Sequence, residues 1–232
     1  ALRQALAFDP GTEADQADER VPRLSDEQRA VFDAVMSAVQ APAANPRGNA
    51  FYVDGPGGSG KTFLYEALIH TVRGKGMISL ACAISGIAGQ LLPGGTTAHS
   101  LFGLPIDMPK HDATSSIRAQ EPRAEVLRRA VLILWDEVSM VPLAALDCVD
   151  RLLRDLTGDN RPFGGKVLIL GGDFRQLLPV VPGANEPELV ANTVLNHYSM
   201  HRAITDENTI GNYFRIIEAH ILQGCDAKWK RK

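Results

Sequence analysis

The sequence predicts a single α/β domain in which a mostly parallel sheet carries helices on both faces. Apolar runs of strand length without polar alternation are typical of parallel strands that are buried on both sides. Four such runs occur, at residues 51–53, 77–83, 131–135 and 167–170. Stretches of helical periodicity alternate with them, as in α/β proteins. The 232 residues are 45% hydrophobic and 22% charged, which suffices for one sizeable core.

The N-terminal part of the chain divides at Ser25. Residues 1–24 carry five acidic residues and few large apolar ones, so we expect an acidic, flexible lead-in. A helix is predicted to begin at Ser25, because Ser25-Asp26-Glu27-Gln28 has the pattern of a capping box. Three valines recur behind it with helical spacing, at Val31, Val35 and Val39.

The next elements follow the same alternation. The strand at 51–53 runs directly into a glycine-rich turn, and a helix is predicted from Thr62 to about Arg73, ended by glycines at 74 and 76. A strand at 77–83 comes next. We expect a turn at 93–97 and irregular structure over 103–122, which is rich in Pro, Asp and Ser.

Two further strands and a helix complete the predicted domain. The strand at 131–135 ends in acidic residues. Pro142 opens a helix with an apolar stripe, and Gly158 closes it. After the strand at 167–170 the pattern weakens. We therefore expect one domain over 25–182, a divergent segment over 183–232 and no complete second domain.

Composition, charge and cysteine spacing give no sign of a nucleic-acid partner, a disulfide framework or a membrane span. The formal net charge of −3 gives no argument for a nucleic-acid partner, so any basic surface must be local. The three cysteines lie far apart, without metal-site or disulfide spacing, which suits a reducing compartment. No apolar run approaches the ~20 residues of a membrane span, and no secretory signal opens the chain.

The strongest motif is the phosphate-binding loop DGPGGSGKT at 54–62. It follows a strand and precedes a helix, which is the context that confirms a P-loop. Glycines let successive backbone N–H groups point at one anion, and the helix N-terminus adds positive potential. Lys61 is expected on the β- and γ-phosphates and the Thr62 hydroxyl on Mg²⁺. The predicted nucleotide cradle consists of Gly55, Pro56, Gly57, Gly58, Ser59, Gly60, Lys61 and Thr62.

An acidic pair follows the strand at 131–135. Asp136 is positioned to hold Mg²⁺ from the side opposite Thr62, and Glu137 to orient and activate a water for attack on the γ-phosphate. An acidic strand end alone is a weak signal. Together with the P-loop it favours nucleoside triphosphate hydrolysis over binding alone, and over a nucleotide kinase.

Two glutamines each have a structural and a functional interpretation. Gln176 follows the strand at 167–170 in the stretch GGDFRQLLPV. If that strand lies beside the P-loop strand, we expect the Gln176 amide to reach the γ-phosphate. The alternative is that Gln176 is only a polar loop residue. Gln28 occupies the third position of the capping box, which is a complete structural explanation. The alternative is an amide that reads the edge of adenine.

The stretch AISGIAGQLLPGGTTAHSLFGLP (83–105) combines hydroxyls, small residues and one aromatic ring. Hydroxyls and free N–H groups suit a sugar-phosphate backbone, and a ring can stack on a base. The alternative is a surface loop with polar caps, which residue chemistry alone slightly favours. The candidate DNA contacts are Ser85, Gly86, Thr97, His99 and Phe102.

Taken together, these motifs resemble the Pif family of superfamily-one DNA helicases, in particular its Helitron-like branch. The resemblance rests on LSDEQRAVFDAV, GPGGSGKTFLYEAL, SGIAGQLLPGGTTAHSLFGLP, LILWDEVSM and GGDFRQLLPVVP, and covers residues 24–182. It implies a RecA-like first motor domain with ATP and Mg²⁺ as cofactors and single-stranded DNA as partner. It also implies 5′-to-3′ translocation, Asp136 on the metal, Glu137 as base and Gln176 as γ-phosphate sensor.

The resemblance also implies parts that we do not find in this sequence. Helicases of this class use a second RecA-like domain, which supplies arginine fingers and half of the DNA track. Three hypotheses therefore stay open: a helicase motor domain, a nucleotide-gated clamp on single-stranded DNA without productive turnover, and an ATPase that acts on proteins. The resemblance implies an intracellular protein, in the nucleus or a mitochondrion if the source is eukaryotic.

Overall fold

A six-stranded sheet forms the centre of the molecule. The structure, a computed structural model, describes residues 7–44, 49–55, 57–106, 113–138 and 141–173, with backbone alone at 54, 143 and 214–216. The strand order is β3-β2-β4-β5-β1-β6, and every pairing is parallel. The strands are β1 (Asn49–Asp54), β2 (Ile78–Ala83), β3 (Thr96–Thr97), β4 (Ala130–Asp136), β5 (Val167–Gly172) and β6 (Phe214–Ile216).

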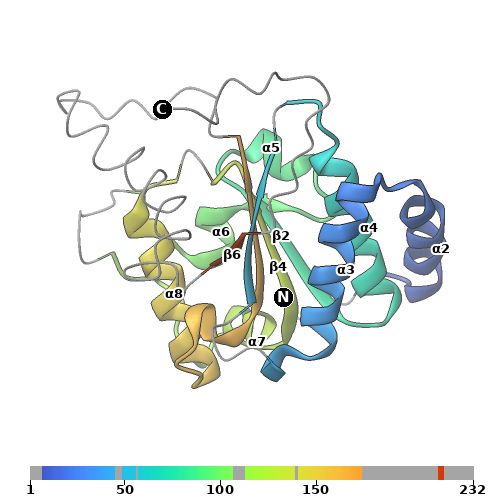
Figure 1. Cartoon of the computed structure of the whole chain (residues 1–232). Helices are drawn as coiled ribbons and strands as arrows, with labels where there is room; N and C mark the ends of the chain where they lie inside the picture. Colours follow the sequence, from blue (N-terminus) through green and yellow to red (C-terminus); the bar gives the residue numbers. More distant parts are fainter. Residues whose placement is uncertain are drawn as a thin grey trace, which may run out of the picture.

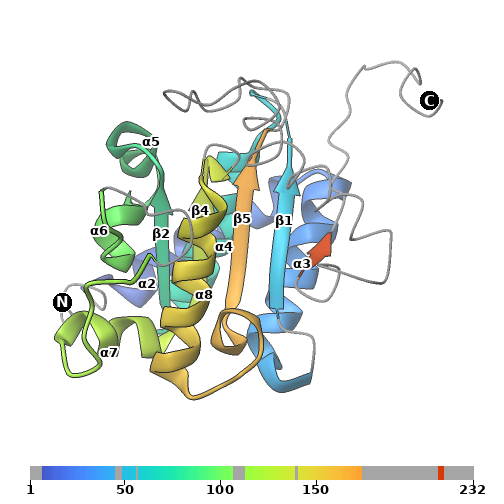
Figure 2. The same cartoon turned by 90° about the vertical axis from the view of Figure 1, so that its left-hand side faces the viewer.

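Helices cover both faces of this sheet, as predicted (Figure 1). One face carries α3 (Asp26–Gln40) and α4 (Lys61–Gly74), and the other carries α7 (Pro122–Arg129) and α8 (Leu143–Thr157). Two short helices, α5 (Gly86–Gln90) and α6 (Ala98–Phe102), follow β2 and β3. The strands point the same way, so their carboxyl ends meet at one edge (Figure 2). This edge is where open α/β sheets bind ligands.

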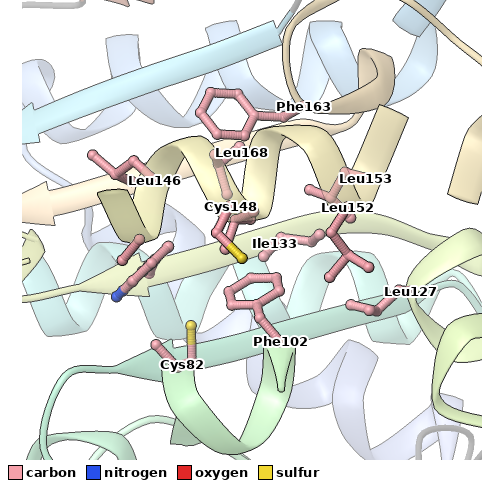
Figure 3. Packing of buried hydrophobic residues seen from close by; sticks show 14 of the residues in the cluster. Cys82, Phe102, Leu127, Ile133, Leu146, Cys148, Leu152, Leu153, Phe163 and Leu168 are labelled. Atoms are coloured by element: carbon pink, nitrogen blue, oxygen red, sulfur yellow. The ribbon is translucent and has the colours of Figure 1, made fainter. Parts of the chain in front are cut away.

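The apolar strands explain why the sheet is a middle layer. Successive residues of a strand point to opposite faces, and in β5 Leu168 and Leu170 join the core beneath α8, while Val167 and Ile169 join the core beneath α3 and α4. All four are buried almost completely. Figure 3 shows the α8 side of this packing, where Leu153, Phe163 and Leu168 belong to the same core as Phe102.

Local signals set the helix ends much as the sequence predicts. Ser25 caps α3 through a complete capping box with Gln28. Helix α8 ends at Gly158, which adopts a left-handed conformation with φ of 70°. Two regions differ from expectation: Thr96 and Thr97 form β3 beside β2 instead of a turn, and α5 and α6 replace much of the loop expected over 83–105.

The expectation of a flexible lead-in is wrong for residues 10–20, which form helix α2 (Pro10–Arg20). The side chain of Asp9 accepts a hydrogen bond from Thr12 N at 2.8 Å, and Pro10 occupies the first turn. Composition suggested disorder because this segment has few large apolar residues; polar contacts and small side chains attach the helix instead. A hydrogen bond and an ion pair join α2 to α4: His70 Nδ1 lies 2.7 Å from Glu13 Oε2, and Arg20 pairs with Glu66 at 3.0 Å.

Small residues let α2 lie close against α4. A Cβ added at Gly74 would lie 2.9 Å from Ala14 Cα, so only glycine fits at this crossing. Phe8, just before α2, stacks on the Arg73 guanidinium with 3.5 Å between Cζ and the ring centroid. Arg73 is 4% exposed, and burial lowers its pKa to about 10, although the nearby Glu13 carboxylate opposes the shift. The N-terminal helix is thus part of the folded domain.

Strand β6 belongs to the segment over 183–232 and pairs with β1 in parallel. The described part of that segment therefore extends the same sheet. In the ranges that the structure describes, no helix is long and apolar enough to cross a membrane.

Candidate functional site

The candidate site lies at the carboxyl edge of the sheet, where β4, β5 and β1 end side by side. In register, Asp54 pairs with Gly172 of β5, and Trp135, one residue before Asp136, pairs with Leu170. Strand β5 thus lies between the strand that leads into the P-loop and the strand that ends in the acidic pair. Sheet topology alone brings the two predicted motifs to the same place.

The P-loop connects β1 to α4 with the geometry that its glycines allow. Gly55 N donates to Gly172 O at 3.2 Å, which anchors the start of the loop on β5. Gly58 and Gly60 have φ of 80° and 82°, a region that other residues rarely adopt. Gly60 is the N-cap of α4, and Lys61 and Thr62 form its first turn. Pro56 lies outside the described residues.

Two close approaches show that the loop is shaped around its glycines. A Cβ at Gly55 would lie 2.6 Å from Ser59 Oγ, and a Cβ at Gly60 would lie 2.6 Å from Gln28 Nε2. Ser59 Oγ is buried and has no hydrogen-bond partner among the residues that the structure describes. The Lys61 ammonium donates to Gly55 O, so it lies over the loop. A cradle of glycines with a donor hydroxyl and an ammonium group fits a nucleotide phosphate.

Gln28 joins α3 to the P-loop. Its Oε1 accepts from Ser25 N at 3.0 Å, and its Nε2 donates to Gly60 O at 3.2 Å. The capping interpretation is therefore confirmed, and Gln28 has a second role as a brace for the loop. A side-chain amide has two N–H donors and two acceptor lone pairs. Beyond these two contacts, Gln28 therefore keeps one N–H and one lone pair for a further partner. Adenine reading stays a prediction.

Asp136 ends β4 close to the P-loop lysine. Burial raises the pKa of Asp136, while the Glu137 backbone N–H and the Lys61 ammonium act in the opposite direction. A Cβ at Gly171 would lie 2.8 Å from Asp136 Oδ1 and 1.9 Å from the Tyr65 hydroxyl oxygen. The carboxylate, the phenol and the end of β5 therefore meet at one point. Mg²⁺ commonly takes one or two protein oxygens and completes its shell with phosphate and water, and Asp136 with Thr62 fits that pattern.

Glu137 follows with a left-handed backbone. Its φ is 56°, and among the residues that the structure describes only Phe163 shares a positive φ without being glycine. Such conformations concentrate at functional sites. Ser85 Oγ, at the end of β2, donates to Glu137 Oε2 at 3.4 Å. Glu137 is half-buried, so its carboxylate lies at the surface of the site.

Asp136→Asn is expected to raise the stability of the nucleotide-free protein at neutral pH. A raised pKa means that the folded state holds the proton more tightly than the unfolded chain, whose value is near 3.8. This carboxyl therefore favours folding below that value, and its contribution is lost as pH rises through the folded pKa. Thermal unfolding at neutral pH should give the variant a higher Tm, and the difference should shrink in acid.

The matched control is Asp155→Asn, which removes an exposed carboxylate from α8. Its Tm should stay close to that of the wild type at both pH values. With added Mg²⁺ and ATP the wild type should have the higher Tm of the two, because only the wild type keeps the carboxylate that is predicted to hold the metal. A lower Tm for Asp136→Asn without nucleotide would contradict the prediction.

Gln176 lies outside the described residues. The condition on which its functional interpretation depends is confirmed, because β5 and β1 pair in parallel from Asn49 and Val167 to Asp54 and Gly172. Asp173, the last described residue of this stretch, is buried. The assignment of Gln176 as γ-phosphate sensor stays a prediction.

The candidate DNA contacts divide into surface residues and one core residue. Ser85 and Thr97 cap α5 and α6 by accepting from Ala88 N and Ser100 N. Ser85 and Gly86 are exposed, and Thr97 and His99 are half-buried. The expectation for Phe102 is wrong: its ring is fully buried, 5.3 Å from the Trp135 ring (Figure 3). Helix α6 folds back onto the sheet, so this ring cannot stack on a base.

Two features of the site escape sequence reasoning. Tyr65 lies on the buried face of α4, where its spacing reads as ordinary core, yet its hydroxyl reaches the carboxyl edge beside Gly171. A polar aromatic four residues after the P-loop lysine is the signal that could have found it. Ile87 and Leu91 are 81% and 67% exposed at α5, although their spacing of four suggests a buried helix face.

Comparison with known proteins places this arrangement among helicases. The family model described as PIF1-like helicase matches residues 23–217. The human ATP-dependent DNA helicase PIF1 is 32% identical over 167 residues, covering 72% of this chain and 24% of that protein. The Pif1 of Bdellovibrio bacteriovorus is 35% identical over 158 residues, covering 68% of this chain and 33% of that protein. The chain thus spans a third or less of the length of these two curated relatives.

Solved structures agree with the family match. Bacteroides Pif1 bound to single-stranded DNA has a TM-score of 0.57 and 31% identity, covering 72% of this chain and 36% of that one. Bacteroides Pif1 in complex with ADP-AlF3 and single-stranded DNA has a TM-score of 0.57, 32% identity and the same coverages. Each likeness therefore covers most of this chain but little more than a third of the solved one.

Proposed function

This chain belongs to the PIF1-like helicase family, and from that premise we propose that it forms the first RecA-like motor domain of an ATP-dependent DNA helicase. In this proposal, ATP hydrolysis at the carboxyl edge of the sheet is coupled to movement along single-stranded DNA. The observation that carries it is the convergence of Lys61, Asp136 and the glycine cradle on one point. The activity of a whole helicase is proposed, since the chain spans a third or less of those relatives.

Each side chain has a distinct role in the proposed reaction. The P-loop amides and Lys61 bind the β- and γ-phosphates, and Ser59 Oγ supplies one more donor from the loop. Thr62 and Asp136 hold Mg²⁺, which neutralises charge on those phosphates when it is bound. Glu137 orients the attacking water and takes its proton.

The remaining roles fall on residues that the structure does not describe. Gln176 senses the γ-phosphate in this proposal. An arginine finger from a second RecA-like domain completes the site, and such a finger contributes roughly 10³–10⁵ in rate in well-studied systems. DNA is the proposed substrate, so we place the protein inside the cell, in the nucleus or a mitochondrion for a eukaryotic source.

Steady-state ATP hydrolysis with and without single-stranded DNA tests the proposal, with Lys61→Ala as the inactive variant. We expect DNA to stimulate turnover, and we expect Lys61→Ala to lower it by about 10²–10³, the cost of removing one preorganised donor to the developing charge. Lys75→Ala is the control, because Lys75 is an exposed lysine at the other end of α4. It should behave as wild type.

The other outcomes separate the remaining hypotheses. ATP binding that changes the affinity for DNA, without turnover, would favour a nucleotide-gated clamp. Turnover that ignores DNA would favour an ATPase that acts on protein partners. A chain that binds no ATP at all would contradict both the motor and the clamp.

A further inference from the structure

Ser85 connects the candidate DNA-binding surface to the candidate catalytic glutamate. It follows β2 by two residues, and Glu137 follows β4 by one. These strands are neighbours, with Ala83 in register with Asp136. Ser85 Oγ donates to Glu137 Oε2 at 3.4 Å and accepts from Ala88 N at 3.2 Å. One exposed hydroxyl therefore serves both the start of α5 and the carboxylate.

A serine hydroxyl has one proton to donate and two lone pairs. The hydrogen bond from Ala88 N uses one lone pair of the hydroxyl oxygen, so it can persist whichever acceptor the hydroxyl donates to. The single hydrogen bond that the O–H donates, in contrast, goes either to Glu137 or to another acceptor. A phosphate oxygen of a DNA strand that crosses α5 is such an acceptor, because Ser85 and Gly86 are exposed there.

We infer that Ser85 is a positioning residue that restrains Glu137 until single-stranded DNA takes its hydroxyl. In the resting protein the hydrogen bond directs the carboxylate toward α5. When a DNA phosphate oxygen accepts a hydrogen bond from the Ser85 hydroxyl, the bond to Glu137 is lost and Glu137 is free to orient the attacking water. The inference rests on the proposed function and adds to it the contact by which DNA accelerates hydrolysis.

The backbone of Glu137 supports this role. A left-handed residue directly after β4 turns the chain away from the line of the strand. A residue held in a sparsely populated backbone region persists when its surroundings fix it. The Ser85 contact is one such constraint, and it joins segments 52 residues apart in the sequence.

Three substitutions at Ser85 separate the cap from the restraint. Ser85→Thr keeps both the acceptor and the O–H. Ser85→Asp keeps an N-cap acceptor for α5, but it lacks the proton and places a like charge opposite Glu137. Ser85→Ala removes both functions.

Hydrolysis without DNA gives the first readout. We expect Ser85→Ala and Ser85→Asp to raise DNA-free turnover by about three- to tenfold, which matches the net contribution of one typical hydrogen bond. The stimulation by oligo(dT) should fall by the same factor, and Ser85→Thr should restore the wild-type ratio. If Ser85→Asp keeps wild-type stimulation, or Ser85→Ala lowers both rates equally, Ser85 is only a helix cap and the inference is overturned.

Binding of fluorescein-labelled oligo(dT) without nucleotide gives a readout that is independent of activity. Glu137→Ala leaves the Ser85 hydroxyl available to DNA. When Ser85 is present, this substitution should therefore tighten DNA binding about threefold more than it does in a Ser85→Ala background. Comparing the two backgrounds cancels the general effect of removing a negative charge. Equal effects in both would overturn the inference and leave the motor proposal standing. A wild type that binds neither ATP nor oligo(dT) would overturn both.

Discussion

Glu137→Gln should lower ATP turnover by about 10²–10⁴-fold, the usual contribution of a general base. Glutamine has the same shape and still accepts a hydrogen bond from Ser85, but it cannot take a proton from water. The P-loop contacts are unaffected, so the affinity for nucleotide should change little. Steady-state hydrolysis and the binding of a fluorescent ATP analogue measure the two quantities separately.

The control for this substitution is Glu121→Gln. Glu121 precedes α7, and its side chain does not cap that helix. This variant loses the same charge away from the site and should keep wild-type turnover. If Glu137→Gln retains more than a tenth of the wild-type rate, Glu137 is not the base, and another group must activate the water.

Gly171→Ala should damage both the fold and the site. The new Cβ would lie 1.9 Å from the Tyr65 hydroxyl oxygen, and the Tyr65 ring is fully buried, so it has little room to move. Overpacking of this kind costs roughly 3 kcal/mol, which lowers Tm by roughly 10 °C for a chain of this size. Because Asp136 Oδ1 lies 2.8 Å from the same point, stabilisation by Mg²⁺ and ATP should also fall.

A second substitution tests whether Tyr65 is the cause. Gly171→Ala combined with Tyr65→Phe removes the nearest oxygen and leaves Asp136 Oδ1 and the ring Cζ, both at 2.8 Å, as the next contacts. Part of the lost Tm should return. Gly11→Ala in α2 serves as the control, since its Cβ would meet nothing closer than 3.4 Å. An unchanged Tm in Gly171→Ala would show that the end of β5 yields more easily than its packing indicates.

The sequence predicted those parts of the fold and site that local patterns determine. Continuous apolar runs identified β1, β2, β4 and β5, since strands buried on both faces lack alternation. The spacing of Gly55, Gly60 and Lys61 fixed the P-loop, and the capping box fixed the start of α3. The functional interpretation of Gln176 requires that β5 lie beside β1, and that pairing is confirmed.

Contacts between distant segments could not be predicted in the same way. The Glu13–His70 hydrogen bond spans 57 residues and helps to dock an acidic stretch as a helix. Phe102 follows the polar residues Thr97, His99 and Ser100 in the sequence, yet α6 carries it into the core against Trp135. The same limit applies to Tyr65 beside Gly171. In each of these cases the role of the side chain depends on which distant residue it contacts, and the residue type alone does not reveal that contact.

Docking of α2 has a practical consequence for anyone who trims this protein to the part that matches the helicase family. The PIF1-like helicase match begins at residue 23, so an expression clone cut at that boundary would omit Phe8, Glu13 and Arg20. Three side chains on the outer face of α4 would then lose the partners described above: Glu66, His70 and Arg73. A shortened clone would therefore expose the back of the helix that carries Lys61, and low solubility of such a clone would say nothing against the motor itself.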